Sequence, residues 1–337
     1  MKEIVLIPAY KPDEEMCFLA KTLQQQGFDI LIVNDGSGAE YNEIFESVSP
    51  YATVISHLHN KGKGRALKTG MEYIRDNCPE CEFFITADAD GQHRAHDIVR
   101  VREELKNGSP FVLTTRLLGR NIPKRSKFGN DLSRVIYTLS TGRYFKDNQS
   151  GLRGFSAENI DWLLKVKGEK YDYEMNMLYY ASKQSIPVTT LDIEAVYIDG
   201  NRSSHFNPVK DTVRIYRLLF SSAKASIITA ILAQIAIFVC ALVTDVPYDS
   251  IYVVTAGLGA AVTAYVINKF FIFNNVDFRD GGRTMLFTFF RYILYALGSA
   301  VITSFLPFVP LFIAFNFCAL LGLPIRYFAH KYISAFN

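Results

Sequence analysis

The sequence lacks the glycine-rich signatures of two common classes of nucleotide-binding enzyme. Neither a Gly-x-Gly-x-x-Gly turn nor a Walker phosphate loop occurs in its 337 residues. Both motifs bring backbone N–H groups up to a pyrophosphate or triphosphate, so we expect neither a dehydrogenase nor a P-loop enzyme. An excess of charge of one sign is also missing. The formal net charge is +3, which gives no support for a protein that coats nucleic acid.

Signals for secretion and for a disulfide framework are scarce as well. The chain opens with Met1-Lys-Glu and leads straight into an apolar run. We therefore expect no secretory leader and a first domain in the cytoplasm. Five cysteines are scattered along the chain. Cys78 and Cys81 have the spacing of a metal-ligand pair, but no second pair accompanies them, and we expect a reduced loop there.

Apolar residues are unevenly distributed and predict three parts. Residues 1–207 mix apolar and charged positions, whereas residues 225–337 hold long apolar runs with few ionisable groups. Between them, residues 208–224 place apolar side chains on one helical face and basic ones on another. Such a helix is typical of the headgroup plane of a membrane. We expect an α/β catalytic domain, an interfacial helix and an all-α transmembrane domain.

The stretch from Glu82 to His93 carries the clearest signal for chemistry. A short apolar run ends in Asp88 and Asp90, and Gln92 follows. A buried parallel strand has this pattern, and α/β sheets bind ligands at the carboxyl ends of their strands. Two carboxylates and an amide suit Mg²⁺ or Mn²⁺, which prefer oxygen ligands and often share them with substrate phosphates. Taken alone, these residues also fit a solvated acidic turn before a helix.

Earlier runs of strand length alternate with helix-forming segments. The expected strands are 4–7, 29–34 and 53–56, and the expected helices are 14–26 and 66–74. This alternation predicts a doubly wound parallel sheet with right-handed crossovers.

Several candidate ligand contacts follow these strands. They are Pro8, Ala9 and Tyr10 after the first strand, Asp35 after the second and Lys63 after the third. Because carboxyl ends of parallel strands meet at one edge, we expect one nucleotide site there. Tyr10 and Asp35 suit a base and ribose. The glycines around Lys63 let the backbone approach a ligand, and Lys63 with its basic neighbours Lys61 and Arg65 suits a phosphate.

Four short motifs in the first part of the chain resemble glycosyltransferase family 2. They are Ile7-Pro-Ala-Tyr10, Asn34-Asp-Gly-Ser37, Asn60-Lys-Gly-Lys-Gly64 and Asp88-Ala-Asp-Gly-Gln-His93, in this order. Within the family, the match is to polyprenyl-phosphate glycosyltransferases such as the dolichyl-phosphate mannose synthases. The resemblance implies a GT-A fold with Tyr10 and Asp35 at the nucleotide. It also implies that Asp88, Asp90 and Gln92 gather around Mg²⁺ or Mn²⁺.

A further strand is expected at residues 111–116. The basic segment that follows it has two interpretations. Residues 116–134 include Arg116 and Arg125. The segment fits a solvated loop, and it also fits a phosphate site, since arginine forms fork-like hydrogen bonds to phosphate oxygens. The family resemblance favours the second interpretation, with Arg116 and Arg125 on the phosphate of a lipid acceptor.

The later part of the catalytic domain supplies candidate sugar contacts. Asp147 opens a segment, up to Phe155, that resembles the family loop closing the sugar pocket. Glu174 is a candidate contact for a sugar hydroxyl or the base, and Arg202 for the diphosphate. The expected catalytic residues are thus Asp90, Arg116, Arg125, Asp147 and Arg202. No Gln-x-x-Arg-Trp motif occurs; processive family members use that motif, so its absence favours a single transfer per donor.

The apolar tail is long enough for four membrane spans. The expected spans are 225–243, 251–273, 287–306 and 311–327. Lysine and arginine lie in the loop at 274–283 and at the C-terminus, whereas the other two loops have none. The positive-inside rule therefore predicts a multi-pass protein with both termini and the catalytic domain in the cytoplasm. The four spans, with Asn268-Lys-Phe-Phe-Ile-Phe273 at the end of the second, resemble a GtrA-like membrane domain.

Together these features predict a membrane-bound sugar transferase. The expected reaction is inverting transfer from a UDP- or GDP-linked sugar to undecaprenyl or dolichyl phosphate, and a homo-oligomer is compatible with the sequence. Transfer to another lipid, such as diacylglycerol, is one alternative. A role of the spans in moving a lipid-linked sugar across the bilayer is another.

Overall fold

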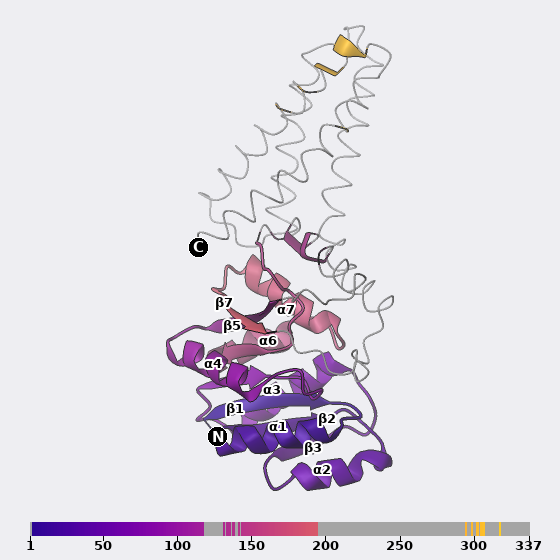
Figure 1. Ribbon diagram of the computed structural model, residues 1–337, viewed down its shortest axis with the longest axis vertical. Coiled ribbons are helices and arrows are strands. Elements are labelled where there is room, and N and C mark those ends of the chain that lie inside the picture. The colour runs from indigo at the N-terminus through magenta and orange to yellow at the C-terminus, as the bar shows by residue number, and fades with distance from the viewer. Residues whose placement is uncertain are drawn as a thin grey trace. The chain divides into compact units, whose positions relative to one another are not determined.

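The computed structural model describes residues 2–117 and 143–194, together with single positions between 131 and 141 and between 294 and 317 (Figure 1). The chain divides into two compact units. One comprises Met1–Arg134 and Phe145–Tyr216, and the other Val135–Tyr144 and Arg217–Asn337. Most of the described residues belong to the first unit.

The described residues of the first unit form a seven-stranded sheet in the order β3-β2-β1-β4-β6-β5-β7. The strands are β1 (Glu3–Ala9), β2 (Asp29–Asn34), β3 (Thr53–Ser56), β4 (Phe83–Thr86), β5 (Phe111–Leu117), β6 (Arg153–Ser156) and β7 (Thr189–Glu194). The α-helices are α1 (Glu14–Gln25), α2 (Asn42–Val48), α3 (Lys63–Asn77), α4 (Ala95–Lys106), α6 (Ile160–Lys165) and α7 (Asp172–Lys183). Two short 3₁₀ turns are η1 (Ala39–Tyr41) and η2 (Ala157–Asn159).

The first four strands confirm the predicted parallel sheet. β1 pairs in parallel with β2 and β4, and β2 pairs with β3. The expected end of the first strand was wrong, because β1 continues through Pro8 to Ala9. Pro8 is tolerated there since pairing with β4 ends at Leu6, so its missing N–H interrupts no ladder on that side.

The second half of the sheet departs from a purely parallel pattern. β6 runs antiparallel to both β4 and β5, while β7 pairs in parallel with β5. The segment from Asp147 to Phe155, expected as a loop, therefore ends inside a central strand. Arg153 in this strand is fully buried, and its guanidinium donates to the carbonyls of Ser150 (2.9 Å) and Glu174 (2.6 Å). The buried arginine thus ties β6 to α7.

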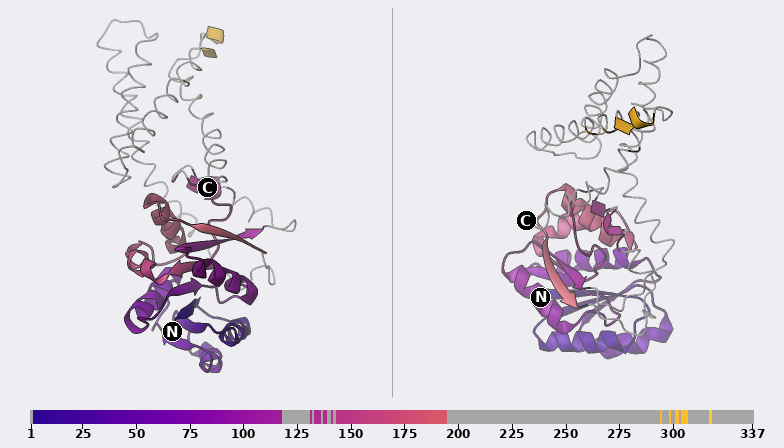
Figure 2. Two further views of the ribbon diagram at one scale, coloured as in Figure 1. Left: turned by 90° about the vertical axis from the view of Figure 1, so that its left-hand side faces the viewer. Right: turned by 45° about the horizontal axis from the view of Figure 1, so that its top comes forward.

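Helices cover both faces of the sheet, which Figure 2 shows from two further sides. One apolar cluster joins α1 and α4 to the face that carries Val5 and Ile7. On the opposite face α3 packs on β1 and β2, and α6 and α7 pack on α3. Gly70 permits this approach, because a Cβ added there would collide with Leu6. The strand ends are therefore held in a rigid three-layer frame.

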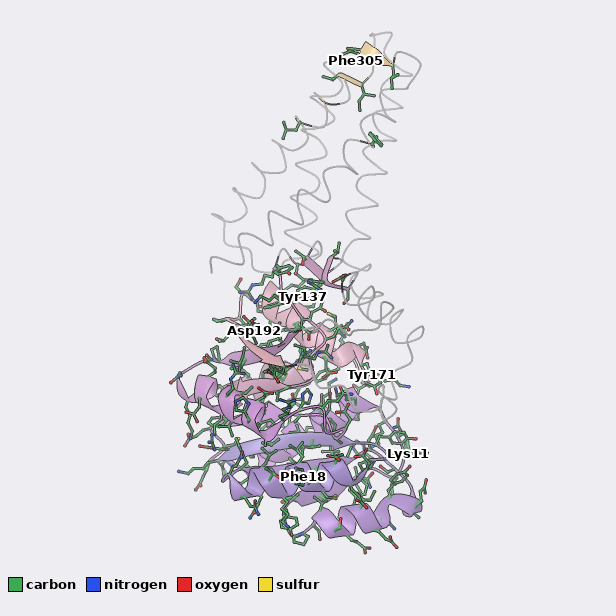
Figure 3. The ribbon with its side chains drawn as sticks, in the orientation of Figure 1. Lys11, Phe18, Tyr137, Tyr171, Asp192 and Phe305 are labelled. Carbon is green, nitrogen blue, oxygen red and sulfur yellow. The ribbon has the colours of Figure 1, made fainter. Side chains whose placement is uncertain are left out.

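Helix boundaries match the predictions in part. Asp13 caps α1 by accepting from the N–H of Glu15 (3.1 Å), and Gly27 after the helix adopts a φ of 86°. The outer face of α1 is exposed at Phe18 (Figure 3). Helix α3 starts at Lys63, three residues before the expected Ala66, so the basic motif lies on the first turn of a helix.

None of the helices in the described part of the chain is long and apolar enough to cross a lipid bilayer. The interfacial helix and most of the four expected spans lie outside the described residues, as do Arg125 and Arg202. The predictions for these segments stay predictions.

Candidate active site

The carboxylate of Asp88 lies just beyond β4 and contacts two nitrogen groups. Its Oδ1 is 2.6 Å from Nζ of Lys63, and its Oδ2 is 3.3 Å from Nε2 of His93. Lys63 begins α3, so the parallel packing of β4 beside β1, with α3 above it, brings these two ends together. Gly151 packs against the same carboxylate, and a Cβ added there would lie 2.9 Å from its Cγ.

Lys63 also reaches a second carboxylate. Its Nζ is 2.9 Å from Oε1 of Glu174 on α7, and the ammonium lies 5.9 Å from the ring centre of Tyr171, which Figure 3 labels at the start of that helix. Burial opposes the charged ammonium, but the charges of Asp88 and Glu174 outweigh it and raise the pKa of Lys63. This lysine therefore stays charged between two carboxylates.

The two aspartates of the motif have opposite pKa shifts. Burial disfavours ionisation of Asp88, but Lys63 and His93 outweigh it and hold the pKa well below its usual range. Burial and the nearby charge of Asp88 raise the pKa of Asp90. Asp90 accepts from the N–H of Gln92 (3.1 Å), which shapes the turn after the strand. The two carboxyl groups therefore influence each other's ionisation at the carboxyl end of β4.

A cavity opens beside this carboxylate. Its lining residues are Asp88, Gln92, His93, Arg116, Gln149, Gly151, Ile193 and Glu194. The cavity therefore has an anionic wall at Asp88 and a cationic wall at Arg116. Such a site can hold two anionic groups side by side, a metal-bound diphosphate near Asp88 and a second phosphate near Arg116.

Arg116 and Asp147, both predicted site residues, form a bidentate pair. Nε of Arg116 lies 2.6 Å from Oδ2 of Asp147, and Nη2 lies 3.2 Å from Oδ1. Asp147 is buried, yet the charge of Arg116 and its hydrogen bonds overcome the burial and lower the pKa of the carboxyl. The sequence did not predict this pairing. It gives Asp147 the role of orienting the guanidinium that lines the cavity.

Asp35 is buried at the end of β2 and engages the backbone rather than solvent. Its carboxylate accepts from the N–H groups of Lys61 (2.9 Å) and Gly62 (2.7 Å). Nδ1 of His57 lies 2.7 Å from Oδ1 of Asp35, and Nε2 of His57 is 3.0 Å from Oγ1 of Thr69. This network holds the loop before α3. The expected direct contact of Asp35 with a nucleotide stays a prediction.

Residues at the end of β1 contact the segment that follows β2. The carbonyl of Ala9 accepts from the N–H of Asp35 (2.8 Å), and Ser37 accepts from the N–H of Lys11 (2.9 Å). Nζ of Lys11 lies 5.6 Å from the ring centre of Tyr10. Pro8, Ala9 and Tyr10 thus lie at the same carboxyl edge of the sheet as Asp35, and their contact with a nucleotide stays a prediction.

Basic side chains at the start of α3 form more contacts within the protein than the sequence suggested. Arg65, expected near a phosphate, forms a bidentate pair with Glu169 at 2.5 and 2.9 Å, and Lys68 adds a third contact to Glu169 (3.0 Å). A Cβ at Gly64 would lie 2.6 Å from Cβ of Tyr173. This glycine therefore permits close packing of α3 against α7, and the expected approach of a ligand to the backbone there stays a prediction.

The donor set at the end of β4 fits a divalent ion. In the described part of the chain, no group of three or more His, Cys, Asp or Glu side chains is arranged as a metal site. The predicted set requires no such group, because Mg²⁺ often takes one or two carboxylates together with substrate phosphates. Asp88 and Gln92 offer oxygens to the same cavity, and Gly151 leaves room around the carboxylate.

Sequence reasoning left several lining residues without a role. His93 is buried against Asp88, and its Nδ1 has no hydrogen-bond partner within the described residues. It lies in the acidic motif, so its position was visible but its contact was not. Gln149 and Gly151 lie in the same segment as Asp147, so their closeness to a predicted site residue could have identified them. Glu194 comes from β7, and no pattern in the sequence marks it.

Comparison with known proteins agrees with this geometry. Residues 4–157 match Glycosyl transferase family 2. A UDP-N-acetylglucosamine–dolichyl-phosphate N-acetylglucosaminyltransferase from Methanococcus voltae is 28% identical, over 64% of this chain and 94% of the relative. A dolichyl-phosphate beta-glucosyltransferase from Dictyostelium discoideum is 26% identical, over 63% of this chain and 72% of the relative.

A solved structure shares the fold. Glucosyl-3-phosphoglycerate synthase from Mycobacterium tuberculosis, crystallised with Mn²⁺, UDP and glucosyl-3-phosphoglycerate, superposes with a TM-score of 0.50 at 15% identity. The match covers 66% of this chain and 78% of that protein. The first part of the chain therefore has the GT-A fold of nucleotide-sugar transferases. It contains a glycosyltransferase family 2 domain, and the protein is a glycosyltransferase.

Proposed function

We propose that this enzyme transfers a sugar from a nucleotide sugar to a membrane polyprenyl phosphate and forms a polyprenyl-phosphate monosaccharide. The observation that carries the proposal is the cavity that Asp88 and Arg116 both line. It offers a carboxylate for a metal-bound diphosphate and a guanidinium for a second phosphate. The dolichyl-phosphate acceptors in the names of two relatives support the same acceptor class.

The reaction needs positioning and charge neutralisation more than a strong base. The acceptor phosphate oxygen attacks the anomeric carbon, a new C–O bond forms, and the nucleoside diphosphate leaves with the electron pair of the broken bond. Attack from the opposite side gives inversion. Because the phosphate is already an anion, no proton has to be removed from it. Arg116, oriented by Asp147, holds this phosphate, and Arg125 is proposed to assist.

Asp88, Asp90 and Gln92 would hold Mg²⁺ or Mn²⁺ in this proposal. The ion would supply Lewis-acid neutralisation of the departing diphosphate. Tyr10 and Asp35 are proposed to lie near the nucleoside, with Pro8 and Ala9 shaping the strand edge. Arg202 is proposed to cover the diphosphate.

The second part of the chain completes the proposal as a membrane domain. Residues 208–224 would lie in the headgroup plane, and residues 225–337 would cross the bilayer four times in a GtrA-like arrangement. The charge distribution between the apolar runs supports a catalytic domain and both termini on the cytoplasmic side. A polyprenyl phosphate in the same leaflet would then meet the cavity at the membrane surface.

The test is a donor and acceptor panel with the full-length protein. Each nucleotide sugar is incubated with undecaprenyl phosphate or dolichyl phosphate, and products are identified by mass spectrometry. The matched controls are the corresponding polyprenol without phosphate and a diacylglycerol. We expect product with one donor and a polyprenyl phosphate, none with the polyprenol, and loss of product after chelation of divalent ions. Efficient transfer to diacylglycerol, or no product with any donor, would contradict the proposal.

A further inference from the structure

The ammonium of Lys63 lies where a cation at Asp88 is expected. It contacts Oδ1 of Asp88 at 2.6 Å and Oε1 of Glu174 at 2.9 Å. All three side chains are largely withdrawn from solvent, with exposed fractions of 16% for Lys63, 28% for Asp88 and 11% for Glu174. The lysine is therefore held as a counter-ion between two carboxylates rather than extended toward an incoming phosphate.

This contact competes with a divalent ion. A metal ion bonded to the Asp88 carboxylate would lie within a few ångströms of the ammonium, and two cations repel strongly where water is largely excluded. Lysine has a flexible four-carbon stem and binds as a point charge, so the ammonium can shift without moving α3. Glu174 already contacts it and offers a position away from Asp88.

We propose that Lys63 is a resident counter-ion of Asp88 that a divalent ion displaces, and that Glu174 retains the displaced ammonium. This inference rests on the metal site of the proposed function. Glu174 is then a positioning residue that acts through Lys63. The arrangement offsets part of the negative charge of Asp88 and Glu174 before the metal arrives. It also leaves a cation beside the site where the donor diphosphate would bind.

The first test measures Mn²⁺ binding to the full-length protein at pH 8, without nucleotide, from the electron paramagnetic resonance signal of free Mn²⁺. Lys63→Met removes the competing charge while keeping the length of the side chain, and we expect at least 10-fold tighter binding, on the order of 1.4 kcal/mol. Lys61→Met is the matched control. It removes an exposed charge two residues away, in the loop before α3, and we expect less than a 2-fold change. Equal or weaker binding by Lys63→Met would overturn the proposal.

The second test separates the role of Glu174 from a general loss of negative charge. Glu174→Gln alone should weaken Mn²⁺ binding about 5- to 10-fold, because the displaced ammonium loses its partner. In the Lys63→Met background the same substitution should have almost no effect. If Glu174 acts directly on the metal through its charge, the weakening persists in both backgrounds, and the proposed role is wrong.

A third variant covers the case that Lys63→Met does not fold. Lys63→Arg keeps the positive charge beside Asp88, so displacement is still required, and we expect Mn²⁺ to bind no more tightly than to the wild type. Tighter binding by Lys63→Arg would contradict the competition. These measurements involve no sugar transfer, so they fail independently of the acceptor: a protein that transfers sugar as proposed but shows unchanged Mn²⁺ affinity in Lys63→Met would retain the proposed function and lose this inference.

Discussion

Asp147 orients Arg116 through two hydrogen bonds, at 2.6 and 3.2 Å, that join the end of β5 to a segment 31 residues further along the chain. Asp147 is buried whereas Arg116 is partly exposed and lines the cavity. Asp147 therefore holds the guanidinium in place, and Arg116 faces the cavity. The sequence had assigned both residues to substrate contacts, and the structure places the guanidinium alone at the cavity wall.

Asp147→Asn should lower kcat more than it lowers affinity for the donor. The substitution removes the charge that fixes the guanidinium, and misplacement of a reacting group by about 1 Å can cost on the order of 100-fold in rate. Loss of hydrogen bonds to a charged group should also cost about 1.5–3 kcal/mol of stability. Steady-state kinetics and thermal unfolding of the purified enzyme measure the two effects.

The surface pair of Lys146 and Asp192 supplies the control for that prediction. Its N–O distance is 3.1 Å, but both side chains are exposed (Asp192 is labelled in Figure 3). Exposed pairs contribute about 0–1 kcal/mol, so Asp192→Asn should leave kcat and thermal stability nearly unchanged. Wild-type kcat in Asp147→Asn, or equal losses in both variants, would show that the buried pair does not position Arg116.

The same carboxyl predicts an acid-dependent loss of stability. The pKa of Asp147 in the folded protein lies below its ordinary value of about 3.9. The folded state therefore prefers the ionised form, and the stabilisation is fully present above about pH 4. It is lost as the pH falls through the lowered pKa, because the folded state must then take up the proton. The difference in unfolding temperature between wild type and Asp147→Asn should therefore be constant above about pH 5 and shrink as the pH falls below about 4. A difference that stays constant at acid pH would contradict this linkage.

The apolar pattern of the sequence predicted the strands whose side chains are buried in the core. β2 and β4 are buried apolar runs closed by polar residues, so sequence alone located them and the acidic pair that follows β4. β6 escaped prediction because its four residues include a glycine and the fully buried Arg153. A charged residue contradicts the apolar pattern of a central strand. It is accommodated here by backbone carbonyls that only the folded chain supplies.

Long-range pairing explains the other gaps between sequence and structure. The motif around Arg65 suggests a phosphate ligand. In the structure its guanidinium instead donates to Glu169, which lies 104 residues away in the chain. Lys63 and Glu174 meet because α3 and α7 pack together on one face of the sheet. A motif shows which chemical groups are present. Tertiary packing decides which of them face each other and which face a ligand.

Gly151→Ala should disable the metal site while preserving the fold. The new methyl group would press on the carboxylate of Asp88, whose Cγ would be 2.9 Å away. Asp88 must then rotate away from Lys63 and the cavity. We expect Mn²⁺ affinity to fall at least 10-fold, about 1.4 kcal/mol, with a parallel loss of activity. Binding is measured by calorimetry and the fold by circular dichroism.

Gly108→Ala is the control for the glycine substitution. Gly108 has open space around its Cβ position but a φ of 91°, so alanine there is strained and costs stability of about 1 kcal/mol or more. This turn is not among the residues that line the cavity. Mn²⁺ affinity should therefore stay within 2-fold of wild type. If Gly151→Ala also keeps normal affinity, Asp88 is not a ligand of the ion.

Asp35→Asn should loosen the loop before α3 and raise KM for the donor. An amide has one acceptor oxygen in place of two, so it cannot accept from the N–H groups of both Lys61 and Gly62 and from His57. Leaving a buried N–H unpaired costs about 1–3 kcal/mol. Hydrogen exchange at Lys61 and Gly62 should accelerate, and KM should rise at least 5-fold with a smaller change in kcat. His59→Gln, an exposed neighbour, should alter neither. If Asp35→Asn raises KM without faster exchange, Asp35 acts on the nucleotide directly rather than through the loop.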